Sequence, residues 1–254
     1  MTEAIRMLMI VCPFIFLAGF VDAVAGGGGV ISLPAYLFAG LPAHIAAGTN
    51  KLSAGFGTIM AAFKYLRDGK VKLRIAVFSA IGAVLGAMIG THLALFISEQ
   101  LLQGLMLVAI PLVAIFLVTQ KGLGKETNEK EMSISKQSII ATLIGLVIGC
   151  YDGLIGPGTG TFLILAFSAL MGLELVTSSG CAKVSNLASN ITSMIIYTLN
   201  GKVLFWLALP AALCAMLGGH AGAHFAIKGG AKNVRYVMFV VLALLFGKTI
   251  LELV

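Results

Sequence analysis

A long stretch of this chain returns about 130 residues further on, and the aspartate and glycines that precede it return as well. Residues 48–71 correspond to residues 180–203. Two homologous halves must fold as similar units, and in a strongly apolar chain such a duplication is typical of proteins built around a pseudo-two-fold axis. Matched positions include Asp22/Asp152, Gly26/Gly156, Gly28/Gly158, Gly48/Gly180, Lys51/Lys183, Ser53/Ser185, Tyr65/Tyr197, Gly69/Gly201 and His92/His224.

The composition indicates that lipid is the solvent of this chain. Apolar residues make up 59% of the 254 positions and charged residues only 11%, whereas a soluble domain carries about 25% charged residues. The net charge of +7 would suit nucleic acid in a soluble protein. Here the basic residues lie mainly in short stretches between apolar runs, which is the placement that orientation in a bilayer requires.

The apolar runs predict an all-α, polytopic membrane bundle of two inverted repeats that contain short helices broken by Gly or Pro. Several runs reach the roughly 20 residues that a helix needs to cross the hydrocarbon. Two are shorter, so they either complete a hairpin of spans or turn back inside the membrane. The predicted division is a first repeat at 1–120, a linker at 121–136 and a second repeat at 137–254. The predicted segments are 4–24, 28–41, 44–66, 73–97, 101–119, 138–155, 159–173, 175–199, 204–227 and 234–254.

Charge placement predicts that the two halves are inserted in opposite directions. The connection at 64–74 carries five basic residues and one aspartate, whereas its counterpart near residue 200 offers only Lys202. The bias reverses one segment later, because no basic residue lies near Glu99 while three occupy the equivalent place in the second half. By the positive-inside rule both termini lie outside. The segments predicted to be cytoplasmic are 64–74, 121–136 and 228–235.

Two glycine-rich breaks, at 26–29 and 156–160, interrupt the apolar runs at corresponding places. Glycine permits unusual backbone angles and Pro157 removes a donor, so both places predict an interrupted helix. Each restarted helix would present free N–H groups and the positive end of its dipole, which suits an anion. Close helix packing through small residues is the alternative. The residues predicted to bind substrate here are Gly26, Gly27, Gly28, Gly156, Gly158 and Thr159.

Lys51 and Lys183 lie at equivalent positions in otherwise uncharged runs. A lysine near the bilayer centre costs about 2.5–3.5 kcal/mol on insertion scales, so its presence needs a reason. Binding of an anionic substrate is one such reason. Pairing with Asp22 or Asp152 and snorkelling to an interface are the alternatives. The amide side chains predicted to join the two lysines in the site are Asn50 and Asn186, which could equally form hydrogen bonds between helices.

Four titratable residues are candidates for proton coupling. Asp22 and Asp152 come just before the breaks, where a carboxylate can accept a proton, pair with a lysine or cap a helix. Pairing or capping is the favoured interpretation. His92 and His224 can carry protons near neutral pH, although an inward histidine bonded to a carbonyl group is the more common arrangement.

The sequence contains no pattern that is typical of an enzyme. It has no Ser/His/Asp set and no HExxH motif, so we expect neither catalytic residues nor a cofactor. The four cysteines lie in or beside apolar runs without a CxxC pair, which predicts free thiols and no metal site. His44 and His220 lack a matched partner, and the sequence assigns them no role.

The paired motifs resemble the TauE/SafE family of sulfite and organosulfonate exporters. The resemblance rests on Gly19-Phe-Val-Asp22-Ala-Val-Ala-Gly-Gly-Gly-Gly29 with Thr49-Asn-Lys51, and on the second-half echoes at 152–160 and Lys183. It covers essentially the whole chain. The resemblance implies a multi-pass transporter of the bacterial inner membrane whose substrates are sulfite, sulfonates or related small organic anions. The second break departs from the first by having Pro157 and Thr159, so the two half-sites need not contribute equally.

These observations together predict a transporter of small, sulfur-containing anions with its site between the two halves, and coupling to protons is a hypothesis that rests on the aspartates and histidines above. A passive anion channel could use the same lining. An intramembrane enzyme is a third hypothesis, and it would need a set of converging acid, base or nucleophile groups that the sequence does not show. The expected partners are a small anion and the lipid bilayer, with no nucleic acid.

Overall fold

A computed structural model describes residues 3–119 and 132–253, with side chains described for 4–109, 132–234, 236 and 237. The regular structure of these ranges is helical, which confirms the predicted all-α fold. The predicted linker at 121–136 falls largely outside the described residues. The helices are α1 (Glu3–Ala25), α2 (Gly29–Phe38), α3 (Ala43–Arg67), α4 (Leu73–Phe96), α5 (Glu99–Thr119), α6 (Ile134–Leu154), α7 (Thr159–Met171), α8 (Leu175–Leu199) and α9 (Phe205–Leu253).

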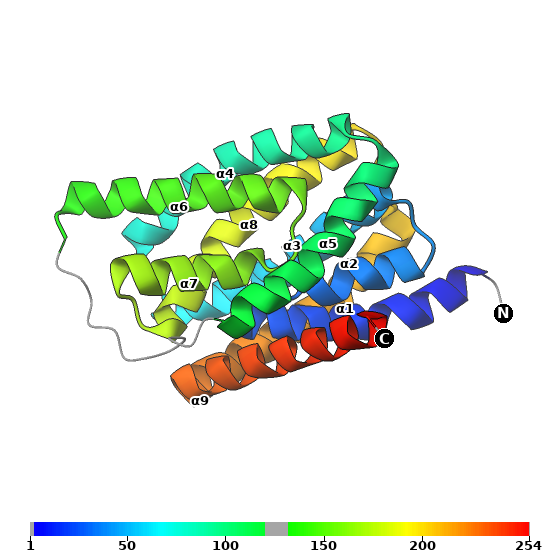
Figure 1. Ribbon diagram of the computed structural model, residues 1–254. Coiled ribbons are helices and arrows are strands. Elements are labelled where there is room, and N and C mark those ends of the chain that lie inside the picture. The colour runs from blue at the N-terminus through cyan, green and yellow to red at the C-terminus, as the bar shows by residue number, and fades with distance from the viewer. Residues whose placement is uncertain (1–2, 120–131, 254) are drawn as a thin grey trace.

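The helices form a bundle in which α4 lies beside α6, α1 lies beside α9, and α3 and α8 run between these two pairs (Figure 1). Within the described ranges, four segments are long and apolar enough to cross a membrane, so the chain is a multi-pass membrane protein. These segments are Ala4–Ala25, Leu73–Phe96, Ile134–Leu154 and Phe205–Val234.

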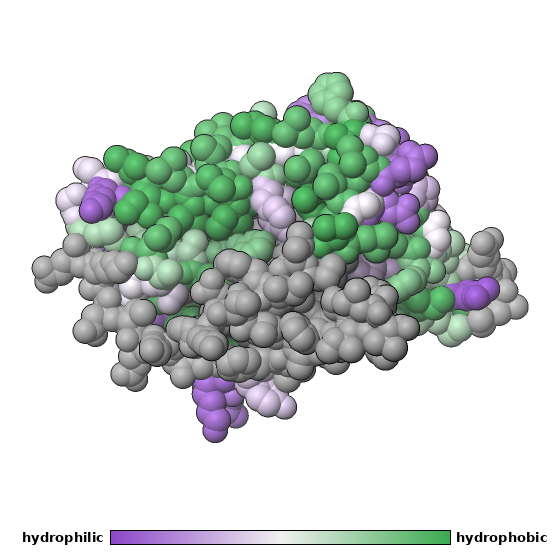
Figure 2. Space-filling view, in the orientation of Figure 1, coloured by the Kyte–Doolittle hydropathy of each residue, from purple (hydrophilic) through white to green (hydrophobic). Residues whose placement is uncertain are grey.

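Helix α4 shows how the sequence separates a lipid-facing side from a packed side. Large apolar side chains recur every four residues from Leu73 to Leu93 and are exposed, while small residues on the opposite side are buried. This spacing places each set on one face of the helix. Figure 2 shows the result on one side of the molecule, where hydrophobic residues cover most of the coloured surface and hydrophilic residues gather near its edges. Such a belt is the surface that lipid tails solvate.

The two short segments are confirmed as short helices that cannot span a bilayer. Helix α2 has 10 residues and α7 has 13, which at 1.5 Å per residue gives lengths of about 15 and 20 Å against a hydrocarbon core of about 30 Å. Each begins directly after a glycine-rich break, and each is followed by a long helix. Therefore α1 with α2, and α6 with α7, form hairpins that turn back within the protein.

Glycine stripes bring the two halves into close backbone contact. On α4, a Cβ at Gly82, Gly86 or Gly90 would collide with the backbone of α6. On α9, a Cβ at Gly218 or Gly222 would collide with the backbone of α1. Small residues that let helices approach this closely are the usual means of helix association in lipid. The same kind of contact thus recurs between the corresponding helices of the two halves.

Helix α9 contains the last two predicted segments. It consists of two helical arms joined by a kink at Gly230, whose φ of 61° and ψ of −155° lie outside the helical region. Only glycine adopts these angles without strain. Its two arms match the segments predicted at 204–227 and 234–254, and they occupy the chain positions that α4 and α5 occupy in the first half.

Candidate functional site

The two glycine-rich breaks meet at the centre of the bundle. A Cβ added to Gly26 would lie within 3.0 Å of the backbone of Gly160, and a Cβ on Gly160 would be equally close to Gly26. Two hydrogen bonds join the breaks: the Thr161 N–H donates to the Gly26 carbonyl at 3.3 Å, and the Thr161 hydroxyl donates to the Ala25 carbonyl at 2.7 Å. The starts of α2 and α7 are therefore held together.

Side chains of the protein satisfy the backbone carbonyls that the breaks release. The Tyr65 hydroxyl donates to the carbonyl of Ala23 at 3.0 Å, just before the first break. At the second break the Tyr151 hydroxyl donates to the Pro157 carbonyl at 2.6 Å. The Thr159 hydroxyl donates to the carbonyl three residues earlier at 2.7 Å. Because lipid offers no hydrogen bonds, irregular backbone at this depth depends on such partners.

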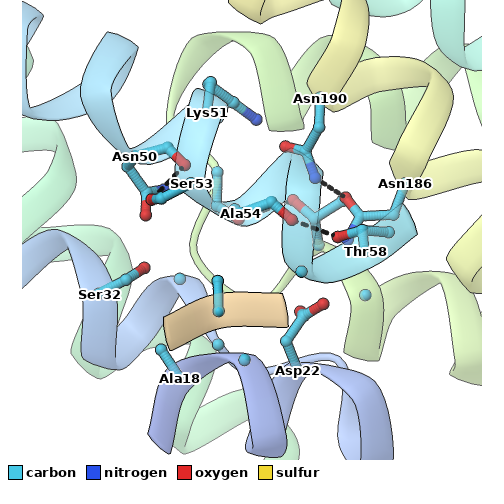
Figure 3. A pocket seen from close by; sticks show the side chains of 18 of the residues that line it. Ala18, Asp22, Ser32, Asn50, Lys51, Ser53, Ala54, Thr58, Asn186 and Asn190 are labelled. Atoms are coloured by element: carbon cyan, nitrogen blue, oxygen red, sulfur yellow. Dashed lines mark hydrogen bonds between the residues drawn. The ribbon is translucent and has the colours of Figure 1, made fainter. Parts of the chain in front are cut away.

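A polar cavity lies where the two breaks meet α3 and α8, and we call it the central cavity. Its empty space, counted with its open mouth, is about 540 Å³. Figure 3 shows α3 side chains on one side of it, Asp22 and Ser32 on the opposite side, and Asn186 and Asn190 entering from α8. The polar side chains that line it are Asp22, Ser32, Asn50, Lys51, Ser53, Thr58, Asp152, Thr159, Asn186 and Asn190.

Each buried lysine pairs with the aspartate of the other half. The Lys51 ammonium lies 2.7 Å from Asp152 Oδ2, and the Lys183 ammonium lies 2.7 Å from Asp22 Oδ2. The Ser189 hydroxyl donates a further hydrogen bond of 2.6 Å to Asp152. Pairing, one of the alternatives that the sequence left open, is thus the observed arrangement. It crosses between the halves, which the sequence did not indicate.

The two pairs differ in their relation to the central cavity. Lys51 and Asp152 both line it, whereas Lys183 is completely buried behind Asp22 and is not among the lining residues. With both pairs intact the four charges cancel. An anion that approaches Lys51 therefore competes with Asp152 for the ammonium group.

Asn50 carries an unsatisfied hydrogen-bonding atom beside Lys51. Its side chain is 7% exposed, and its Oδ1 has no hydrogen-bond partner among the described residues. An unpaired buried polar atom costs about 1–3 kcal/mol. Because Oδ1 is an acceptor, a water or another donor in the central cavity can supply the missing partner, whereas an oxyanion can bind Asn50 only through its Nδ2 amide group. Across the cavity, by contrast, Asn190 donates to the Asn186 side chain at 3.4 Å.

The structure brings most of the predicted site residues together, but not the two histidines. Gly27, Gly158 and Lys183 lie next to lining residues without lining the central cavity themselves. His92 and His224 are exposed on α4 and α9, and the His92 ring bonds to the Met88 carbonyl at 2.7 Å. The predicted residues that line the cavity are Gly26, Gly28, Asn50, Lys51, Gly156, Thr159, Asn186, Asp22 and Asp152.

Ser32 and Thr58 also line the central cavity, but the sequence did not predict them, because no repeat or motif marks them.

His44, to which the sequence assigned no role, makes two contacts with other helices. Its Nδ1 contacts the Glu99 carboxylate and its Nε2 lies 2.9 Å from the Ala94 carbonyl oxygen. It ties the start of α3 to the start of α5 and the end of α4. The two residues are 55 positions apart in the chain, so no local signal could have revealed the contact.

Comparison with known proteins agrees with this architecture. A probable membrane transporter protein of Sinorhizobium is 33% identical over 94% of this chain and 90% of its own length. One from Haemophilus influenzae is 31% identical over 99% and 98%, and YfcA of Escherichia coli K12 is 29% identical over 98% and 95%. No solved structure matches the chain. The family model "Sulfite exporter TauE/SafE" matches residues 11–249. The chain belongs to the TauE/SafE sulfite exporter family of membrane transporters.

Proposed function

We propose that this transporter carries small sulfur-containing anions, such as sulfite or sulfonates, and binds them in the central cavity. The observation that carries the proposal is the position of the cavity. It lies inside a membrane protein, at the meeting point of the starts of α2 and α7, and Lys51 lines it. The family model is named for sulfite exporters, which favours this class of substrate.

The cavity offers three kinds of group that recognise an oxyanion. The starts of α2 and α7 provide the positive ends of two helix dipoles, although most N–H groups of their first turns already donate to backbone carbonyls. Lys51 provides an ammonium group, and the amides and hydroxyls of Asn50, Asn186 and Ser53 provide neutral hydrogen bonds. The backbone and neutral contributions matter, because the lysine charges are already balanced by aspartates.

That balance gives a physical reason for proton coupling. An anion can take the Lys51 ammonium only if Asp152 moves away or loses its charge. A proton on Asp152 removes the competing charge, so anion and proton would enter the site together. Asp22 stands in the same relation to Lys183, although that lysine is more deeply enclosed. In this proposal His92 and His224 have no part, because both are exposed away from the cavity.

We further propose that residues 1–120 and 137–254 are inverted repeats in the bacterial inner membrane, joined by the linker at 121–136. Each buried lysine pairs with the aspartate of the other half, and glycine contacts recur between corresponding helices. Both observations support a two-fold symmetry relation between the halves. Transport would then follow from rocking of one half against the other around the cavity, as in other inverted-repeat carriers.

A thermal-shift screen followed by transport in proteoliposomes tests the function. We expect one anion among sulfite, thiosulfate, sulfonates and carboxylates to raise the melting temperature, since a ligand at 100 times its Kd stabilises the folded state by about 2.7 kcal/mol. The same anion should then show saturable counterflow, and an imposed pH gradient should drive its accumulation. Voltage-driven currents far above carrier rates would indicate a channel instead.

Two variants and a control locate the site in the same screen. Lys51→Met should abolish the shift that the anion produces, and Asn50→Ala should weaken it. Lys64→Met is the matched control, because Lys64 pairs with Asp68 at the end of α3, far from the cavity lining. An undiminished shift in Lys51→Met would move the binding site elsewhere, and accumulation that ignores the pH gradient would remove proton coupling from the proposal.

A further inference from the structure

A second cavity lies against the same ion pair, on the other side from the central cavity. Its empty space, counted with its open mouth, is about 230 Å³, and we call it the vestibule. Its lining is mainly apolar, with Leu33, Met106 and Tyr197 among its walls. The residues that line both the central cavity and the vestibule are Asn50, Lys51, Asp152 and Gly156.

The order of lining residues along α3 places the ion pair between the two cavities. Ala47 lines only the vestibule, Lys51 lines both cavities, and Ala54 and Thr58 line only the central cavity. At 1.5 Å per residue, these positions cover about 16 Å along the helix axis. The path along α3 therefore runs from the vestibule, past Lys51, into the central cavity and towards the 64–74 end of the helix.

Helix α8 repeats this order, whereas at the second break the residues that line only the vestibule lie between two residues that line both cavities. At the second break, Ile155 lines only the vestibule, Asp152 and Gly156 line both cavities, and Gly160 lines only the central cavity. On α8, Tyr197 lines the vestibule, whereas residues nearer the start of the helix line the central cavity. Helices α3 and α8 thus agree that the change from one cavity to the other occurs at the level of the ion pair, and at the second break Asp152 and Gly156 line both cavities.

We propose that the Lys51–Asp152 ion pair is a gate, and that the two cavities are consecutive parts of one substrate path. This inference rests on the proposed function, because it takes the central cavity as the binding site. The ammonium and carboxylate close the path at 2.7 Å, and the Ser189 hydroxyl holds Asp152 in place from α8. Parting of the pair joins the vestibule to the central cavity.

The second ion pair is not part of the gate. Lys183 is completely buried and lines neither cavity, and Asp22 lines only the central one. Breaking this pair leaves the boundary between the cavities intact. The two ion pairs are therefore equivalent in the repeat but differ in position. The Lys51–Asp152 pair lies at the boundary between the cavities, and the other pair lies within the packed helices. It also supplies a matched control.

Cysteine accessibility tests the gate without any substrate. In the full-length chain with Cys12, Cys150, Cys181 and Cys214 replaced by alanine, we introduce Ile155→Cys for the vestibule or Ala54→Cys for the central cavity. A membrane-impermeant maleimide is applied from either face of oriented vesicles. With the gate intact, Ala54→Cys should react only from the face of the 64–74 connection and Ile155→Cys only from the opposite face.

Opening of the gate should remove this one-sidedness. With Lys51→Met and Asp152→Asn together, both cysteines should react from both faces, whereas Lys183→Met with Asp22→Asn should leave the pattern unchanged. The charge-swapped pair Lys51→Asp with Asp152→Lys should restore one-sided reaction, and it decides the matter if the neutral pair does not fold. One-sided reaction that survives in the folded neutral pair would overturn the gate. A failed anion screen would not alter this result, so the two proposals fail separately.

Discussion

Replacement of Lys183 by methionine is expected to lower the free energy of unfolding by about 3–5 kcal/mol, because it leaves Asp22 without its partner in a buried site. Lys183 is completely buried and its ammonium lies 2.7 Å from Asp22 Oδ2. For a protein of this size the loss corresponds to a fall in melting temperature of roughly 6–20 °C. Thermal unfolding of the purified protein in detergent measures it.

The double variant Lys183→Met with Asp22→Asn separates the pair from its environment. Neutral side chains of similar volume often replace a buried ion pair at little cost, so most of the lost stability should return. Equal melting temperatures for the wild-type protein and Lys183→Met would show that the pair does not hold the halves together. A double variant as unstable as the single one would assign the loss to packing of the lysine stem.

The second large effect is expected at the crossing of the two breaks. Gly26 has a φ of 80°, and its missing Cβ leaves room for the backbone of Gly160. Gly26→Ala therefore combines a strained backbone with a backbone collision, and neither α1 nor α7 can yield without breaking the hydrogen bonds at Thr161. We expect the largest fall in melting temperature among the glycine variants, together with loss of the anion-induced shift.

Two companion variants separate strain from collision. Gly40 has a φ of 89° but no heavy atom within 4 Å of its added Cβ, so Gly40→Ala carries only the strain of about 1 kcal/mol. Gly160→Ala keeps a helical backbone and carries only the collision with Gly26. The expected order of stability is Gly40→Ala, then Gly160→Ala, then Gly26→Ala. If Gly26→Ala were no worse than Gly40→Ala, the breaks would not be in contact.

Local chemistry made much of the site predictable from the sequence. The glycine clusters at 26–29 and 156–160 predicted helix breaks, and α2 and α7 begin where these clusters predicted them to begin. A lysine in an apolar run needs a partner or a ligand, so Lys51 and Lys183 were identified by their cost alone. Repetition of each feature in the second half then favoured a shared site over chance.

Partner choice could not be predicted, because it depends on packing between distant helices. Nothing near Lys51 in the chain shows that its partner is Asp152 of the other half. The repeat makes Lys51 and Lys183 equivalent in sequence, but the packing of α3 and α8 gives them different positions. Lys51 lies at the boundary of the two cavities, whereas Lys183 lies behind only the central one. Ser32 and Thr58 are ordinary small polar residues in membrane helices, and only the fold aims them at the cavity.

Binding of an anion where the two breaks meet is the central proposal for this transporter, and anomalous diffraction tests it most directly. Selenite matches sulfite in shape and charge, and its selenium can be located in crystals of the protein without ambiguity. We predict an anomalous peak for selenium in the central cavity, placed so that a selenite oxygen lies at hydrogen-bond distance (about 3 Å) from the Asn50 amide nitrogen and another lies beside the Lys51 ammonium. A peak at another place, or an empty central cavity in crystals of protein that selenite stabilises in solution, would contradict the account.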